Sequence, residues 1–185
     1  MKPRNGRGVF EGGPGFAAKL AVDLEQIVKA LIGAGRTDGE GHAILSDVLA
    51  AAIRITEADI GTLQIVRQGA LNLEVQIGFD RSFTEHFAVV RDATCACGVA
   101  LQMGQRILVE DAAASSVFGD GPDRNAILTA GVAAVQSRPL VYRGEKIVAM
   151  LSTHYRTPRE LADRDFQRLD LLADLTGALI QRAGL

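Results

Sequence analysis

Apolar residues recur with helical spacing in three stretches of the chain, and this pattern predicts three amphipathic helices. The first covers Phe16–Ile32 and is followed by glycines, which commonly end helices. The second runs from about Gly41 to Glu57, and the third from about Asp163 to Arg182. The start of the third helix is open, because Thr157 begins a capping-box pattern that competes with Asp163 as the cap.

Other apolar segments are short and bounded by turn residues, which is the pattern of β-strands. In Leu71–Gly78 apolar and polar residues alternate, so its four apolar side chains are expected on one buried face. The clearest hairpin is Gly131–Tyr155, with a tight turn at Arg143-Gly144. Pro139 inside this hairpin requires a strand edge or a bulge, because proline lacks a backbone donor. The expected strands are Ile60–Val66, Leu71–Gly78, Arg106–Glu110, Val132–Val141 and Lys146–Tyr155.

The remaining segments predict short helices around a loop. Helical turns are expected within Asp80–Val90, Gly98–Gly104 and Arg124–Ala130, and the polar segment Asp111–Asp123 is long enough to form a lid or pocket wall. Strands that are neighbours in sequence are joined by short turns, so the sheet is expected to be mostly antiparallel. The element order therefore predicts an α+β fold.

Composition and charge argue against several classes of protein. The chain has 185 residues, 48% hydrophobic and 23% charged, with a formal net charge of −2. The absence of a basic face argues against a nucleic-acid partner. No apolar run reaches membrane-spanning length, and the basic, glycine-rich residues 1–15 are expected to be a disordered tail and not a signal peptide. A cytoplasmic location is the resulting expectation.

Several strings resemble the GAF domain family of small-molecule sensor modules, over residues 41–182. The main string is AGVAAVQSRPLVYRGEKIVAMLSTH (Ala130–His154), followed by Leu169–Ala173 on the last helix. Supporting strings are Ile77-Gly78-Phe79, Ala96-Cys97-Gly98 and Arg106–Asp111. The resemblance implies a central antiparallel sheet of five or six strands with helices on both faces. It also implies a pocket roofed by residues 80–130.

The chain is therefore expected to divide into a tail (1–15) and a separate amphipathic helix (16–35), both indicated by the residue pattern, and a GAF domain (41–182), implied by the resemblance. GAF domains commonly dimerise through their terminal helices, so a homodimer is expected. The strings are most similar to GAF domains of bacterial histidine kinases and related two-component proteins. The expected function is therefore non-catalytic sensing of an unidentified small molecule, with a histidine kinase or another signalling protein as the output partner.

Two departures from the family patterns narrow the range of expected ligands. The motif of cyclic-nucleotide-binding GAF domains has no counterpart, and the Cys-His pair that carries a bilin is missing, because Ala96 follows Cys95 and Gly98 follows Cys97. No cofactor is assigned. The alternatives are a cysteine-dependent enzyme of the free methionine sulfoxide reductase type and a ligand-free dimerisation scaffold.

Cys95 and Cys97 are the most reactive side chains of the expected pocket region. A helix starting at Gly98 would favour the thiolate of Cys97, which would suit a redox or soft-metal site. Packing of a buried thiol is the competing and favoured interpretation. Two thiols alone do not complete a zinc site.

Polar residues on the hairpin are the other candidates. Gln136, Ser137 and Arg138 interrupt an apolar strand, and Gln136 is the one favoured to face the pocket. Of the three histidines, His154 lies at the end of the expected pocket strand and either contacts a ligand or serves the sheet. We find no catalytic constellation or phosphate-binding glycine loop. The predicted ligand-contacting residues are Thr94, Cys95, Cys97, Asp111, Gln136, Ser152 and His154.

Overall fold

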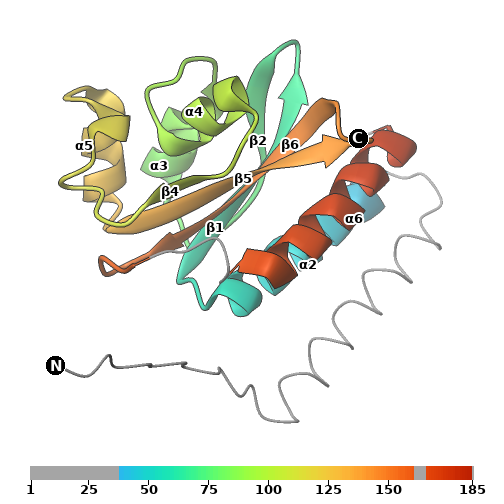
Figure 1. Ribbon diagram of the computed structural model, residues 1–185, viewed down its shortest axis with the longest axis horizontal. Coiled ribbons are helices and arrows are strands. Elements are labelled where there is room, and N and C mark those ends of the chain that lie inside the picture. The colour runs from blue at the N-terminus through green and yellow to red at the C-terminus, as the bar shows by residue number, and fades with distance from the viewer. Residues whose placement is uncertain (1–37, 161–165, 185) are drawn as a thin grey trace, which may run out of the picture.

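The computed structural model describes residues 38–160 and 166–184. In it, six strands form one antiparallel sheet in the order β3-β2-β1-β6-β5-β4. Figure 1 shows helices on both faces of this sheet, which confirms the predicted α+β class. The strands are β1 (Ile60–Arg67), β2 (Ala70–Ile77), β3 (Val89–Val90), β4 (Ile107–Val109), β5 (Ala134–Tyr142) and β6 (Lys146–Tyr155).

The helices divide between the two faces of the sheet (Figure 1). The long helices α2 (Asp38–Thr56) and α6 (Gln167–Ala183) lie side by side on one face. The opposite face is covered by short helices, which are α3 (Arg81–His86), α4 (Ala96–Met103), the 3₁₀ turn η1 (Ser116–Phe118) and α5 (Pro122–Thr129). Two apolar cores result, one on each side of the sheet.

Two tight turns fix the register of the hairpins. Gln68-Gly69 joins β1 to β2, and Arg143-Gly144 joins β5 to β6. All four residues have positive φ, between 53° and 77°, which suits the right-handed twist of the strands they connect. Pro139 pairs with Met150 of β6 but lies beyond the last residue that pairs with β4, so its missing N–H leaves no gap in the ladder on that side.

The alternation predicted for the second strand is wrong, because a β-bulge interrupts the pairing of β1 with β2. Leu63 pairs with Val75, but Gln64 pairs with Leu73, so Glu74 is an extra residue. Because of this extra residue, the apolar side chains before and after the bulge point to opposite faces of the sheet. Leu73 therefore faces the short helices, whereas Val75 packs in the core beneath α2 and α6.

Element boundaries differ from the expectations in a few places. The strand β3 was not predicted, because it is two residues long and pairs only with β2. The helix α4 begins at Ala96, two residues earlier than expected. Thr157–Glu160 is not helical, so the capping-box start of the last helix is wrong, and Asp163 and the predicted helix Phe16–Ile32 lie outside the described residues.

Candidate functional site

A pocket lies between the sheet and the short helices. Its floor comes from β1, β2, β5 and β6, and its walls and roof come from α3, α4, η1 and α5. The space open to the centre of a water molecule is about 20 Å³, which is enough for one water. The lining residues are Thr62, Gln64, Leu73, Phe83, Phe87, Cys95, Ala96, Cys97, Phe118, Ile127, Val135, Ser137, Ser152 and His154.

A row of hydroxyl groups crosses the pocket floor. Thr62 of β1 pairs with Ser152 of β6, and Ser152 pairs with Ser137 of β5. Because side chains alternate along a strand, these three residues share the face of the sheet that carries the pocket. The hydroxyl oxygens of Ser137 and Ser152 lie 2.8 Å apart, so one of them donates a hydrogen bond to the other.

Two residues that line the pocket each carry a buried polar atom with no hydrogen-bond partner among the described residues. The atoms are Oε1 of Gln64 and Nδ1 of His154, and the two residues are 2% and 5% exposed. Leaving such a group unpaired costs about 1–3 kcal/mol. Burial lowers the pKa of His154 to about 3, so its imidazole is neutral at pH 7. The ring meets Phe79 edge-on, at a centroid distance of 5.0 Å.

The two cysteines form a thiol pair in the pocket wall. Their sulfur atoms lie 3.3 Å apart, and Cys95 occupies the N-cap position of α4. The contact between the thiols lowers the pKa of Cys95, and the same contact together with burial raises the pKa of Cys97 well above its ordinary value. The helix begins before Cys97 and not after it, so the alternative of a helix-stabilised thiolate at Cys97 loses its basis, and the favoured interpretation, packing of this thiol, stays a prediction.

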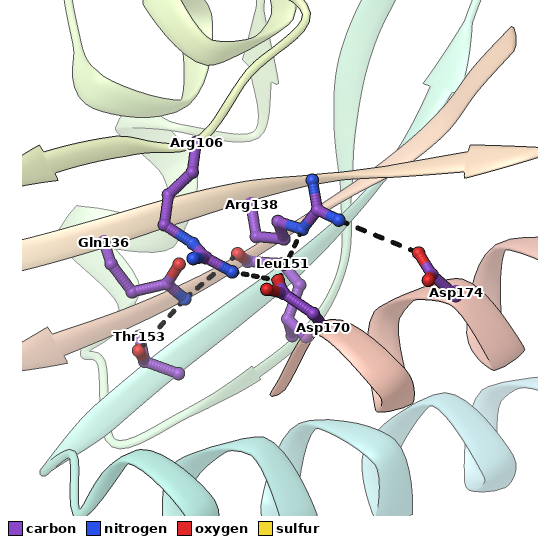
Figure 2. Close-up of polar contacts among 7 residues, drawn as sticks. All are labelled: Arg106, Gln136, Arg138, Leu151, Thr153, Asp170 and Asp174. Atoms are coloured by element: carbon purple, nitrogen blue, oxygen red, sulfur yellow. Dashed lines mark hydrogen bonds and ion pairs between the residues drawn. The ribbon is translucent and has the colours of Figure 1, made fainter. Parts of the chain in front are cut away.

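Three predicted ligand contacts lie away from the pocket lining. Gln136 faces α6 and not the pocket, because strand alternation places its neighbour Ser137 on the pocket side. Its amide nitrogen donates to the carbonyl oxygen of Leu151 and to the hydroxyl of Thr153 (Figure 2). Asp111 accepts hydrogen bonds from the backbone of its own loop.

Thr94 lies in the pocket cover. Its hydroxyl donates to Oδ2 of Asp123 at 2.6 Å, and Oδ1 of the same carboxylate lies 2.7 Å from Nε2 of His86. These contacts join α3 and α5 over the segment that precedes Cys95. The predicted residues that do meet at the pocket are Cys95, Cys97, Ser152 and His154.

Sequence reasoning missed Thr62, Gln64 and Ser137 as pocket residues. Gln64 carried a usable signal, because it is a large polar residue in an otherwise apolar strand. It lies two residues after Thr62, and both therefore share one face of β1. Choosing the face required knowing which side α2 covers.

A model of the GAF domain family matches residues 42–181. The chain belongs to the GAF domain family. A comparison of the sequence with curated proteins returns no match. The six-stranded antiparallel sheet with helices on both faces is the fold that the resemblance implied.

Solved structures similar to this GAF domain come from several bacteria. The GAF domain of an Acinetobacter phosphoenolpyruvate-protein phosphotransferase is 15% identical with a TM-score of 0.69, over 90% of this chain and 95% of that one. A domain assigned to a two-component sensor histidine kinase of Sinorhizobium meliloti is 18% identical with a TM-score of 0.61, over 76% and 90%. The free methionine-R-sulfoxide reductase of Neisseria meningitidis is 17% identical with a TM-score of 0.67, over 91% and 92%. At these identities the likeness shows the fold alone.

An ion-pair cluster connects the sheet of this GAF domain to α6, on the face opposite the pocket (Figure 2). Nε of Arg138 lies 2.9 Å from Oδ1 of Asp170, which also pairs with Arg106. A second nitrogen of Arg138 lies 3.7 Å from Asp174. Arg106 also stands over the ring of Phe166, 4.8 Å from its centroid. Arg138 follows Ser137 directly in β5, so one short segment contacts both the pocket and α6.

Residues 38–160 and 166–184 of this GAF domain contain neither a metal-ligand cluster nor a membrane-spanning helix. No group of three His, Cys, Asp or Glu side chains there is placed to hold a metal ion. In the same residues, no helix combines the length and apolar character that crossing a bilayer requires.

Proposed function

We propose that this GAF domain is a non-catalytic sensing module of bacterial two-component signalling, acting in the cytoplasm. The observation that carries the proposal is that two residues of one pocket lining, Gln64 and His154, each bury an unpartnered polar atom, Oε1 and Nδ1 respectively. A bound molecule that formed hydrogen bonds with both atoms would be held by them, because each is a buried polar group that lacks a partner within the described protein. The similarity to the Sinorhizobium meliloti sensor kinase domain supports the signalling context.

A change at the pocket can be transmitted to the helices on the other face of the sheet through two neighbouring residues. A ligand that contacts Ser137 displaces or tightens β5, and the next residue, Arg138, pairs with Asp170 of α6. A ligand can shift this arrangement only by binding one of two states more tightly than the other. We propose that the two states differ in the position of α6 relative to the sheet.

The proposed output is a homodimer interface formed by α2 and α6, which signals to a histidine kinase or another partner. Leu171 of α6 supports this interface, because its large apolar side chain is 55% exposed on the face away from the sheet core. It follows Asp170 directly, so movement of the ion pair would also move the exposed leucine.

The thiol-enzyme alternative predicts turnover of free methionine sulfoxide with a thiol reductant. We expect no turnover, because a zwitterionic amino acid needs charged partners, and the described residues that line the pocket include no Asp, Glu, Lys or Arg. Turnover that is lost in Cys97→Ser would favour the enzyme over the sensor.

Native mass spectrometry of the freshly purified full chain tests the sensing proposal. We expect a population with a bound small molecule, which Gln64→Leu reduces and the exposed control Gln102→Leu retains. A bare protein or a bare dimer in every preparation would contradict the proposal and favour the scaffold.

A further inference from the structure

We infer that the pocket takes a small uncharged molecule with both a hydrogen-bond donor and an acceptor, of which a primary carboxamide is the simplest. This inference rests on the proposed sensing function and narrows its ligand. It uses the charge, the hydrogen-bonding groups and the size of the pocket.

The pocket has no means to neutralise a charged ligand. Among its described lining residues, the ionisable groups are His154 and the two thiols. His154 is neutral at pH 7, because burial lowers its pKa to about 3. Arg106 and Arg138 are engaged with Asp170 on the other face of the sheet. An anion here would lose its hydration without gaining a cation, which is costly. Ionisation of Cys95 would repel it further.

The polar groups call for a ligand that both donates and accepts. Oε1 of Gln64 can only accept, so its partner must donate. In the pair Ser137–Ser152 only one hydroxyl can donate to the other, so the second keeps a proton for another acceptor. A carboxamide supplies both functions in one plane. It can also pair with Nδ1 of His154, whichever tautomer the imidazole adopts.

The remaining walls favour a compact ligand with some apolar surface. Phe83, Phe87 and Phe118 line the pocket, and each is buried. The open space of about 20 Å³ is small, so the ligand must be small, and the proposal requires the short helices to move outward to admit it. Carboxamides of a few non-hydrogen atoms are therefore the fitting probes. We expect dissociation constants of roughly 1 mM, which correspond to about 4 kcal/mol and lie within the ceiling of about 1.5 kcal/mol per non-hydrogen atom for very small ligands.

The test compares isosteric pairs on the full chain at pH 7: acetamide with acetate, and propionamide with propionate. Binding is followed by two-dimensional amide NMR of Ser137 and Ser152, with titration to about 10 mM, which saturates a millimolar site. We expect the amides to shift these signals and the carboxylates to leave them in place. Gln64→Leu should weaken amide binding about tenfold, and the control His42→Phe, on the exposed face of α2, should not.

Each outcome decides the inference. Carboxylates that bind as tightly as the amides overturn it, although the pocket would then still be a ligand site. Failure of both members of each pair overturns it as well, and native mass spectrometry then judges the sensing function separately. If Gln64→Leu does not fold, His154→Phe serves as the second pocket variant, and the wild-type comparison of amide with carboxylate remains decisive alone.

Discussion

Ser137 of β5 and Ser152 of β6 face each other across the sheet, with their hydroxyl oxygens 2.8 Å apart on the pocket floor. Both residues are almost fully buried. Removing one hydroxyl leaves the other without this partner. We expect Ser152→Ala to lower the free energy of unfolding by about 1–3 kcal/mol.

A double-mutant cycle isolates this contact. Urea unfolding of Ser137→Ala, Ser152→Ala and the double variant should give a coupling energy of about 1 kcal/mol, because both partners are then absent together. Strict additivity of the two single effects would show that the hydroxyls do not depend on each other.

Asp170 is the carboxylate shared by Arg138 of β5 and by Arg106, which directly precedes β4. The Arg106 side chain is only 8% exposed, so Asp170→Asn removes an anion that pairs with a largely buried guanidinium. We expect a loss of about 1–3 kcal/mol in unfolding free energy. Asp174→Asn is the matched control, since its side chain is 69% exposed and it should change stability by less than about 0.5 kcal/mol. Equal effects of the two variants would show that the ion pairs of Asp170 do not stabilise the fold in this way.

His154 gives the protein a defined pH dependence. Its pKa falls from 6.5 to about 3 on folding because of burial, so below pH 6.5 the unfolded chain binds the proton more readily than the folded one. The contribution of His154 to stability is therefore complete above pH 6.5 and is lost as the pH falls toward 3.

The measurement is urea unfolding of wild type and His154→Asn between pH 7 and pH 4. Below pH 6.5 the wild type should lose up to about 1.4 kcal/mol more per pH unit than the variant. Carboxylates elsewhere act on both proteins and cancel in the difference. Parallel pH profiles would mean that His154 is accessible to protons in the folded state.

Gly98 allows the start of α4 to pack against the preceding loop. A Cβ at this position would overlap the carbonyl oxygen of Asp92, which belongs to the backbone. We expect Gly98→Ala to cost about 1–3 kcal/mol and to lower the melting temperature. Gly121→Ala is the control, because its Cβ would meet no atom within 4 Å. A tolerated Gly98→Ala would show that the loop carrying the thiol pair adapts freely.

Much of the fold followed from patterns that single residues carry. Short apolar runs, together with the turn at Arg143-Gly144, predicted five of the six strands. What could not be predicted depends on contacts between segments. The bulge at Glu74 arises in the pairing of β1 with β2, and β3 is too short to have a pattern.

The region of the chain that forms the site could be predicted, but the individual residues that line it could be predicted only in part. The hairpin placed Ser152 and His154 correctly in the pocket, whereas Gln136 faces the opposite side. Three consecutive polar residues do not reveal which of them faces which core. That choice depends on the position of α6, whose Asp170 binds Arg138.

The central claim is that ligand binding in the pocket shifts α6, which lies on the other side of the sheet. Hydrogen–deuterium exchange tests it most directly, comparing the full chain as purified with the same chain after unfolding and refolding to remove any bound compound. The account predicts faster exchange in the stripped protein both in residues 81–129, which cover the pocket, and in residues 167–183 of α6. Exchange that changes only in the pocket cover, or not at all, would contradict it.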